Sequence, residues 1–129
     1  MINPYLELGG REAVLRLSER FYELMDEREP ALAALHPLEN GKVSRRSRER
    51  FGLFLIGWLG GPEDYVAQNG HPRLGMRHGR VPIDTAQRDA WLRCMYAALE
   101  DCGASAELQA FLRPRFAEVA SFLRNIEEE

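Results

Sequence analysis

The chain has 129 residues, 45% of them hydrophobic, and a net charge of −3, which predicts a single domain over residues 1–129 with one core. The acidic balance argues against nucleic-acid binding, and the longest apolar run, residues 53–56, is far too short to cross a membrane. Residues 1–10 show neither a basic region nor an apolar core, so they do not look like a signal peptide and we expect a cytoplasmic protein.

Helices dominate the predicted structure. Apolar residues recur at steps of three and four in four segments, about residues 10–27, 44–59, 84–101 and 105–126. Asp84 or Thr85 suits the N-cap of the third helix, and Pro114 should kink the fourth. Residues 39–42, ENGK, are typical of a loop. Because no segment alternates with a period of two, we expect almost no strand and an all-α fold.

The two cysteines favour a reducing compartment. Cys94 and Cys102 lie eight residues apart on one predicted helix, a rise of roughly 12 Å. That separation is too large for a disulfide unless the helix unwinds. We therefore expect two buried or half-buried thiols.

Arginines gather in two places. Residues 44–50, SRRSRER, hold four of them, and three more surround His78. They are Arg45, Arg46, Arg48 and Arg50, and then Arg73, Arg77 and Arg80. Such a cluster indicates either a solvated helix face or a site for a small polyanion, such as a pair of cofactor carboxylates.

Several chemistries lack support in the sequence. No nucleophile elbow occurs, neither cysteine has a histidine nearby in the chain, and LGGP at residues 59–62 follows a helix and not a strand. A zinc site could be assembled from His71, His78 and a cysteine, but their spacing matches no zinc motif. Serine or cysteine hydrolysis and phosphate binding by a glycine-rich loop are therefore not expected.

A haem site agrees better with the residues. His78 ends a short segment before Gly79, an arrangement that would aim an imidazole at a central cavity. Flat or soft apolar walls would come from three helices, through Phe21, Phe51, Phe54, Trp91 and Met95. Arg50 and Arg77 would pair with haem propionates. From spacing alone, however, plain core aromatics and a surface or capping histidine remain the commoner outcome.

The motifs resemble those of one known family. Residues 58–99, WLGGPEDYVAQNGHPRLGMRHGRVPIDTAQRDAWLRCMYAAL, closely resemble the central block of group II truncated haemoglobins, and RFYELM at residues 20–25 and LHP at residues 35–37 also match. The resemblance runs from about Tyr5 into the last helix. It implies a truncated globin-like fold, a two-over-two helical sandwich around haem b.

The resemblance also implies roles for individual residues. His78 matches the axial iron ligand, while Tyr22 and Trp91 match hydrogen-bonding residues of the distal pocket. His36 lies at the pocket rim, either as a hydrogen-bonding neighbour of Tyr22 or as a sixth iron ligand. The other matches are Ser47 and Phe51, which face the pocket, Phe54 one turn on, and Arg50 as a propionate partner.

Some residues depart from the family pattern near the axial ligand. Gly75 and Gly79 lie on either side of His78 and should loosen the segment that holds it, because glycine adds backbone freedom. His71 belongs to the GHP turn, where we expect a structural role.

The implied function is O₂ and small-ligand binding with redox chemistry on O₂, nitric oxide or peroxide, in the manner of a nitric oxide dioxygenase or a peroxidase. The alternatives are non-catalytic O₂ storage, transport or sensing and, more distantly, a haem-free interaction domain. The expected partners are gaseous or peroxide ligands and an unidentified reductase. Neither a membrane nor nucleic acid is expected as a partner, and the chain would act as a monomer or a homodimer.

Overall fold

The computed structural model describes residues 2–62 and 83–123, and these are mostly helical. The helices are α1 (Pro4–Leu8), α2 (Arg11–Arg28), α3 (Pro30–Ala33), α4 (Arg45–Trp58), α7 (Thr85–Asp101) and α8 (Ala106–Leu123), and the strands are β1 (Leu38–Glu39) and β2 (Lys42–Val43). The all-α expectation is confirmed. Each of the four long helices begins one residue after its predicted start.

Side-chain caps mark where α4 and α7 begin. The carboxylate of Asp84 accepts a hydrogen bond from the backbone N–H of Gln87 at 2.9 Å, which settles the choice between Asp84 and Thr85. Ser44 caps α4 in the same way by accepting from the backbone N–H of Ser47. Each cap satisfies a donor that the first helical turn leaves without an intrahelical partner.

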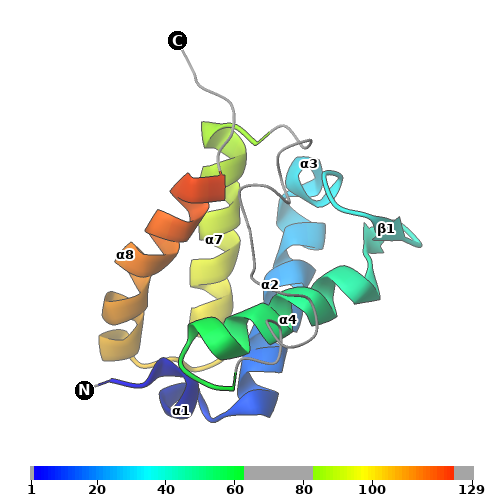
Figure 1. Ribbon diagram of the computed structural model, residues 1–129. Helices are drawn as coiled ribbons and strands as arrows, with labels where there is room; N and C mark the ends of the chain where they lie inside the picture. Colours follow the sequence, from blue (N-terminus) through cyan, green and yellow to red (C-terminus); the bar gives the residue numbers. More distant parts are fainter. Residues whose placement is uncertain (1, 63–82, 124–129) are drawn as a thin grey trace.

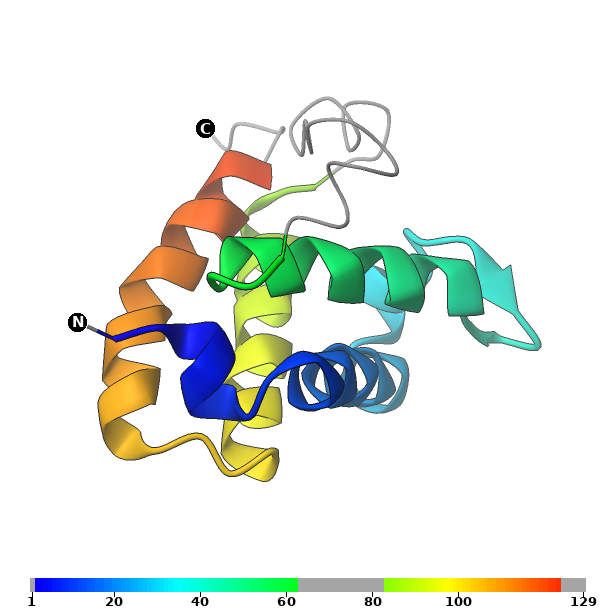
Figure 2. The ribbon, with the colours of Figure 1, turned by 60° about the horizontal axis from the view of Figure 1, so that its bottom comes forward.

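The long helices form two pairs. α4 crosses α2, and α7 lies beside α8, with α2 also packed against α7 (Figures 1 and 2). The helices enclose a shared core of fully buried side chains. Its largest members are Phe21, Phe116, Leu17, Leu24, Met25, Leu55, Ile56, Leu59, Met95, Leu99, Leu112 and Val14. The expected two-over-two sandwich is therefore the observed arrangement.

A glycine lies where α4 crosses α2. A Cβ atom at Gly52 would stand 2.8 Å from Leu15 Cδ2 and 3.5 Å from Ser18 Cβ. One helical turn earlier, the Ser18 hydroxyl donates to the backbone carbonyl of Arg48 at 2.9 Å. The small residue and this hydrogen bond bring the two helices close together, which fixes how the side chains of α4 are presented to those of α2.

The expectation of almost no strand missed a short hairpin. β1 and β2 pair antiparallel with Leu38 opposite Val43 and Glu39 opposite Lys42, and Figure 1 shows the hairpin at the edge of the molecule. Asn40 and Gly41 have φ values of 55° and 78°, as a two-residue turn with left-handed geometry requires. The Asn-Gly pair inside ENGK was the signal, but two-residue strands are too short to show a period of two.

A short first helix was also missed. The side chain of Asn3 caps α1 by accepting from the backbone N–H of Leu6 at 3.1 Å. The N–H of Tyr5 donates to the carbonyl of Leu59 at 3.0 Å, so α1 is tied to the C-terminal end of α4. None of the helices in the described parts of the chain is long and apolar enough to cross a membrane.

The thiols differ in exposure. Both cysteines are free, as expected, but only Cys94 is buried. Cys102 caps the C-terminus of α7 and is exposed, so the prediction of a buried or half-buried thiol is wrong at this position. The helix ends one residue before it, where its side chain no longer faces the core.

Candidate functional site

Five aromatic side chains meet between α2, α4 and α7, and we call them the aromatic cluster. They are Phe21, Tyr22, Phe51, Phe54 and Trp91. The Phe21 ring lies at the centre, with its centroid 4.9 Å from Tyr22, 5.2 Å from Phe51 and 5.2 Å from Trp91. Phe51 stacks on Phe54 at 6.0 Å. The fold thus brings together aromatic residues that are up to 70 positions apart in the chain (91 − 21).

His36 extends the aromatic cluster at one end. Its ring lies edge-on to Tyr22, with centroids 5.7 Å apart, and the side chain is half-buried just after α3. Its Nδ1 atom lies 3.0 Å from the carbonyl oxygen of Leu32. A carbonyl oxygen only accepts hydrogen bonds, so Nδ1 carries the proton, and in the neutral ring Nε2 is the acceptor atom.

Two side chains of the aromatic cluster, both largely buried, carry a hydrogen-bond donor. Tyr22 is 5% exposed and Trp91 is 8% exposed. Within residues 2–62 and 83–123, neither the phenol hydroxyl nor the indole N–H makes a hydrogen bond. Burial raises the pKa of Tyr22 well above its ordinary value, and the nearby Arg48 cation opposes this only in part. The phenol therefore keeps its proton, and both groups remain donors available to a ligand.

Arg50 supplies an unsatisfied cationic group on the same helix as Phe51 and Phe54. The Nε atom of its guanidinium is buried and has no hydrogen-bond partner in the described parts of the chain. The residue as a whole is only half-buried, but a buried N–H that lacks a partner is unfavourable. The side chain is therefore well suited to a carboxylate ligand.

Arg48, two residues earlier, has a hydrogen-bond partner within the protein for each of its three guanidinium nitrogens. Its guanidinium donates to Asp26 at 2.5 Å, to Glu19 at 3.2 Å and to the carbonyl of Val43 at 2.9 Å. Arg45 also pairs with Glu19. We call Glu19, Asp26, Arg45 and Arg48 the ionic cluster. It tethers α2 to the start of α4 and to the hairpin.

The ionic cluster corrects the interpretation of residues 44–50. Arg48 is only 8% exposed, so it belongs neither to a solvated face nor to a polyanion site. Sequence reasoning missed this role. Glu19 and Asp26 lie seven residues apart on α2, a spacing that puts both carboxylates on one helix face and could have indicated a buried cationic partner.

The remaining candidates fall into two groups. Met95 is fully buried in the core beside the aromatic cluster. Ser47 is half-buried in the first turn of α4, where its hydroxyl accepts a hydrogen bond from Ser44 at 3.0 Å. His78, Arg77 and His71 lie outside the described residues, so the structure gives no position for them.

The described residues offer several of the groups that a flat, carboxylate-bearing cofactor would need. The aromatic cluster offers apolar ring faces, Arg50 offers an unsatisfied buried donor for a carboxylate, and Tyr22 and Trp91 offer donors for a small ligand. These are the features that a haem site needs beside its axial ligand. No group of three or more metal-ligating side chains occurs elsewhere in the described ranges.

Comparison with known proteins gives consistent matches over nearly the whole chain. The model of the family described as bacterial-like globin matches residues 3–125. Group 2 truncated hemoglobin YjbI of Bacillus subtilis is 34% identical over 122 residues, which cover 95% of this chain and 88% of that protein.

Solved structures agree in fold. The cold-adapted truncated hemoglobin of Pseudoalteromonas haloplanktis is 38% identical, with a TM-score of 0.89, and the match covers 98% of this chain and 100% of that one. The group II 2-on-2 hemoglobin of Agrobacterium tumefaciens is 36% identical, with a TM-score of 0.88, over 98% of this chain and 97% of the other. The likeness therefore extends to sequence and fold together.

Proposed function

The chain belongs to the bacterial-like globin family and, within it, to the group II truncated haemoglobins, and from this membership we propose a haem b protein that performs redox chemistry on O₂, nitric oxide or peroxide. Membership itself implies haem-based binding of small ligands. The haem type, the reaction and the residue roles are our proposal. It treats residues 1–129 as one haem-binding domain.

His78 is the proposed axial iron ligand, and Arg50 and Arg77 are the proposed partners of the propionates. The proposal for Arg50 is supported by its unsatisfied buried Nε atom. Phe21, Ser47, Phe51, Phe54 and Met95 would line the remaining faces. Haem, when bound, supplies an iron atom that coordinates small ligands and exchanges electrons with them.

The distal residues would act as hydrogen-bond donors. Trp91 donates only, and Tyr22 stays protonated because burial raises its pKa. Donors held in a buried site stabilise negative charge that develops on a ligand, and this slows ligand release. The observation that carries the proposal is that Tyr22 and Trp91, two largely buried side chains, make no hydrogen bond within residues 2–62 and 83–123. Slow release suits chemistry on a bound ligand better than delivery.

A non-catalytic O₂ store or transporter is the alternative. The two readings differ in the O₂ dissociation rate and in the nitrate formed when O₂-loaded protein is mixed with nitric oxide. We expect slow dissociation and nearly one nitrate per haem. Fast dissociation without nitrate would favour the alternative and contradict our proposal. In our proposal an unidentified reductase restores ferrous iron.

We also propose a cytoplasmic location, with which the two free thiols agree.

His36 is proposed as a rim residue that hydrogen-bonds near Tyr22. Ligation of iron by Nε2 is compatible with the Nδ1 bond to Leu32, but it would require the loop after Leu35 to move. An absorption spectrum of the ferric protein at several pH values distinguishes the two roles. We expect a high-spin spectrum that is unchanged in His36→Ala. A low-spin spectrum that disappears in this variant would assign His36 as the sixth ligand.

A further inference from the structure

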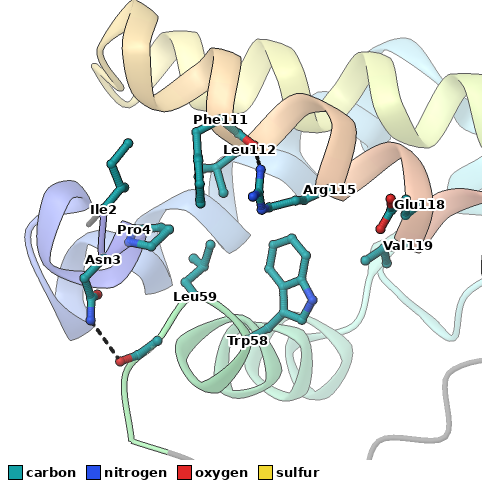
Figure 3. A pocket seen from close by; sticks show the side chains of 11 residues that line it. Ile2, Asn3, Pro4, Trp58, Leu59, Phe111, Leu112, Arg115, Glu118 and Val119 are labelled. Atoms are coloured by element: carbon teal, nitrogen blue, oxygen red, sulfur yellow. Dashed lines mark hydrogen bonds between the residues drawn. The ribbon is translucent and has the colours of Figure 1, made fainter.

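A groove lies between α1, the end of α4 and the middle of α8 (Figure 3). It has a volume of about 430 Å³. It is lined by Ile2, Asn3, Pro4, Trp58, Leu59, Gly60, Phe111, Leu112, Arg115, Glu118 and Val119. Its walls are mostly apolar, and Figure 3 shows the Trp58 ring standing between α4 and α8.

Trp58 connects this groove to the aromatic cluster through a single ring. Its centroid lies 4.7 Å from that of Phe116, and Phe116 lies 6.0 Å from Trp91. Phe116 is 1% exposed, whereas Trp58 is only partly buried. Two oxidisable indoles are thus joined by one buried phenyl ring in contact with both. Such a contact chain provides a short path for an electron between the proposed ligand site and the surface.

We propose that Trp58 is a surface electron-exchange site at which a neutral phenol, bound in this groove, is oxidised. The inference rests on the peroxide chemistry of the proposed function, which supplies the oxidant. A tryptophan outside the aromatic cluster would otherwise have only a packing role.

The charges of the groove favour a neutral aromatic ligand. Among the described residues that line it, only Arg115 and Glu118 are charged, and their charges cancel. The Arg115 guanidinium lies 3.6 Å from the centroid of the Phe111 ring and donates to the Phe111 carbonyl at 2.6 Å. This cation therefore lies along the groove wall, where the Glu118 carboxylate balances its charge. The Glu118 carboxylate can accept the hydrogen bond of a phenol hydroxyl.

The reaction balances as one peroxide and two phenols giving two waters and two phenoxyl radicals. The O–O bond of hydrogen peroxide breaks, and its two oxygen atoms leave as water. Each phenol loses one electron through Trp58 and one proton from its hydroxyl, so peroxide is reduced and the phenol is oxidised. Between the two half-reactions the Trp58 indole loses an electron and regains it from the phenol.

The test compares Trp58→Phe with wild type after haem loading. Hydrogen peroxide is added without a phenol, and oxidised side chains are mapped by peptide mass spectrometry. We expect oxidation concentrated at Trp58 in the wild type, and its suppression when guaiacol is present. In Trp58→Phe, guaiacol oxidation should fall at least tenfold, while peroxide changes the Soret spectrum at the wild-type rate.

Tyr96→Phe is the matched control. Tyr96 is another partly exposed aromatic residue, but its hydroxyl donates to the Arg113 carbonyl and its ring lies outside the contact chain. This variant should behave as wild type. Phe116→Leu keeps Trp58 but removes the bridging ring, and should lower both Trp58 oxidation and guaiacol turnover.

The outcomes separate the two proposals. Normal reaction with peroxide, together with unmodified Trp58 and undiminished guaiacol oxidation in Trp58→Phe, would overturn the relay alone. A wild-type spectrum that peroxide leaves unchanged would contradict the peroxide chemistry of the proposed function, and the relay with it.

Discussion

Arg48 and Arg50 lie two residues apart on α4 and have opposite surroundings. The guanidinium of Arg48 is paired with Asp26, Glu19 and a backbone carbonyl, whereas the buried Nε of Arg50 has no partner in the described ranges. The same contrast separates the ionic cluster from the donors of the aromatic cluster. The paired polar groups hold the helices together, and we propose that the groups without a partner in the described ranges bind a ligand.

Replacing each arginine in turn should give the largest effects, on the free energy of unfolding for Arg48 and on haem retention for Arg50. Arg48→Met leaves Asp26 buried without its cation, and the loss of one partner of a buried pair typically destabilises by about 3–5 kcal/mol. Arg50→Met should leave the unfolding free energy of the haem-free protein nearly unchanged, because no pair is lost, but should weaken haem retention. Urea unfolding and the rate of haem transfer to an acceptor protein measure the two effects. Equal destabilisation by both variants would contradict the assignment.

Trp91→Phe should speed O₂ release. The change keeps an aromatic ring against Phe21 and removes the donor N–H. Loss of a hydrogen bond to a charged group corresponds to roughly a tenfold or greater change in rate. Stopped-flow measurement of O₂ dissociation tests this, with Phe116→Leu as a control for disturbed packing near Trp91. An unchanged rate would mean that the indole N–H does not face the ligand.

Because Tyr22 is buried, the free energy of unfolding should fall as the pH rises above the ordinary pKa of tyrosine. Burial raises its folded-state pKa, so the phenol contributes fully below its ordinary pKa of about 10. As pH rises through that value the unfolded chain ionises first, and stability falls until the folded-state pKa is passed. Tyr22→Phe should flatten this decline in unfolding experiments between about pH 9 and 11. The same slope in both proteins would contradict the burial argument.

The smallest expected effect is a difference between the two cysteines in the rate of alkylation. Burial raises the pKa of Cys94 to about 11, and its thiol is enclosed, whereas Cys102 is exposed at the end of α7. At pH 8, alkylation should therefore modify Cys102 first and leave Cys94 intact until the protein unfolds. Peptide mapping with Cys102→Ser as a control tests this order. Faster labelling of Cys94 would show that α7 opens locally.

The features that could be predicted from the sequence are those that depend on the spacing of apolar residues and on residue type. The four long helices followed from apolar spacing, and the meeting of Phe21, Phe51 and Trp91 followed from the aromatic walls that the spacing placed on three helices. The burial of Arg48 did not follow, because it depends on two carboxylates brought over from α2. The contact of Trp58 with Phe116 likewise depends on how α4 and α8 pack, which no local pattern records.

The central claim is that His78 holds haem iron beside the aromatic cluster. The most direct measurement is the visible spectrum of hemin-supplied protein, compared with His78→Ala and with His71→Ala as the control. A His36→Ala background excludes rescue by the other imidazole. We predict a stable Soret band in the wild type and in His71→Ala and its loss in His78→Ala. A colourless wild type, or an unchanged Soret band without His78, would contradict the account.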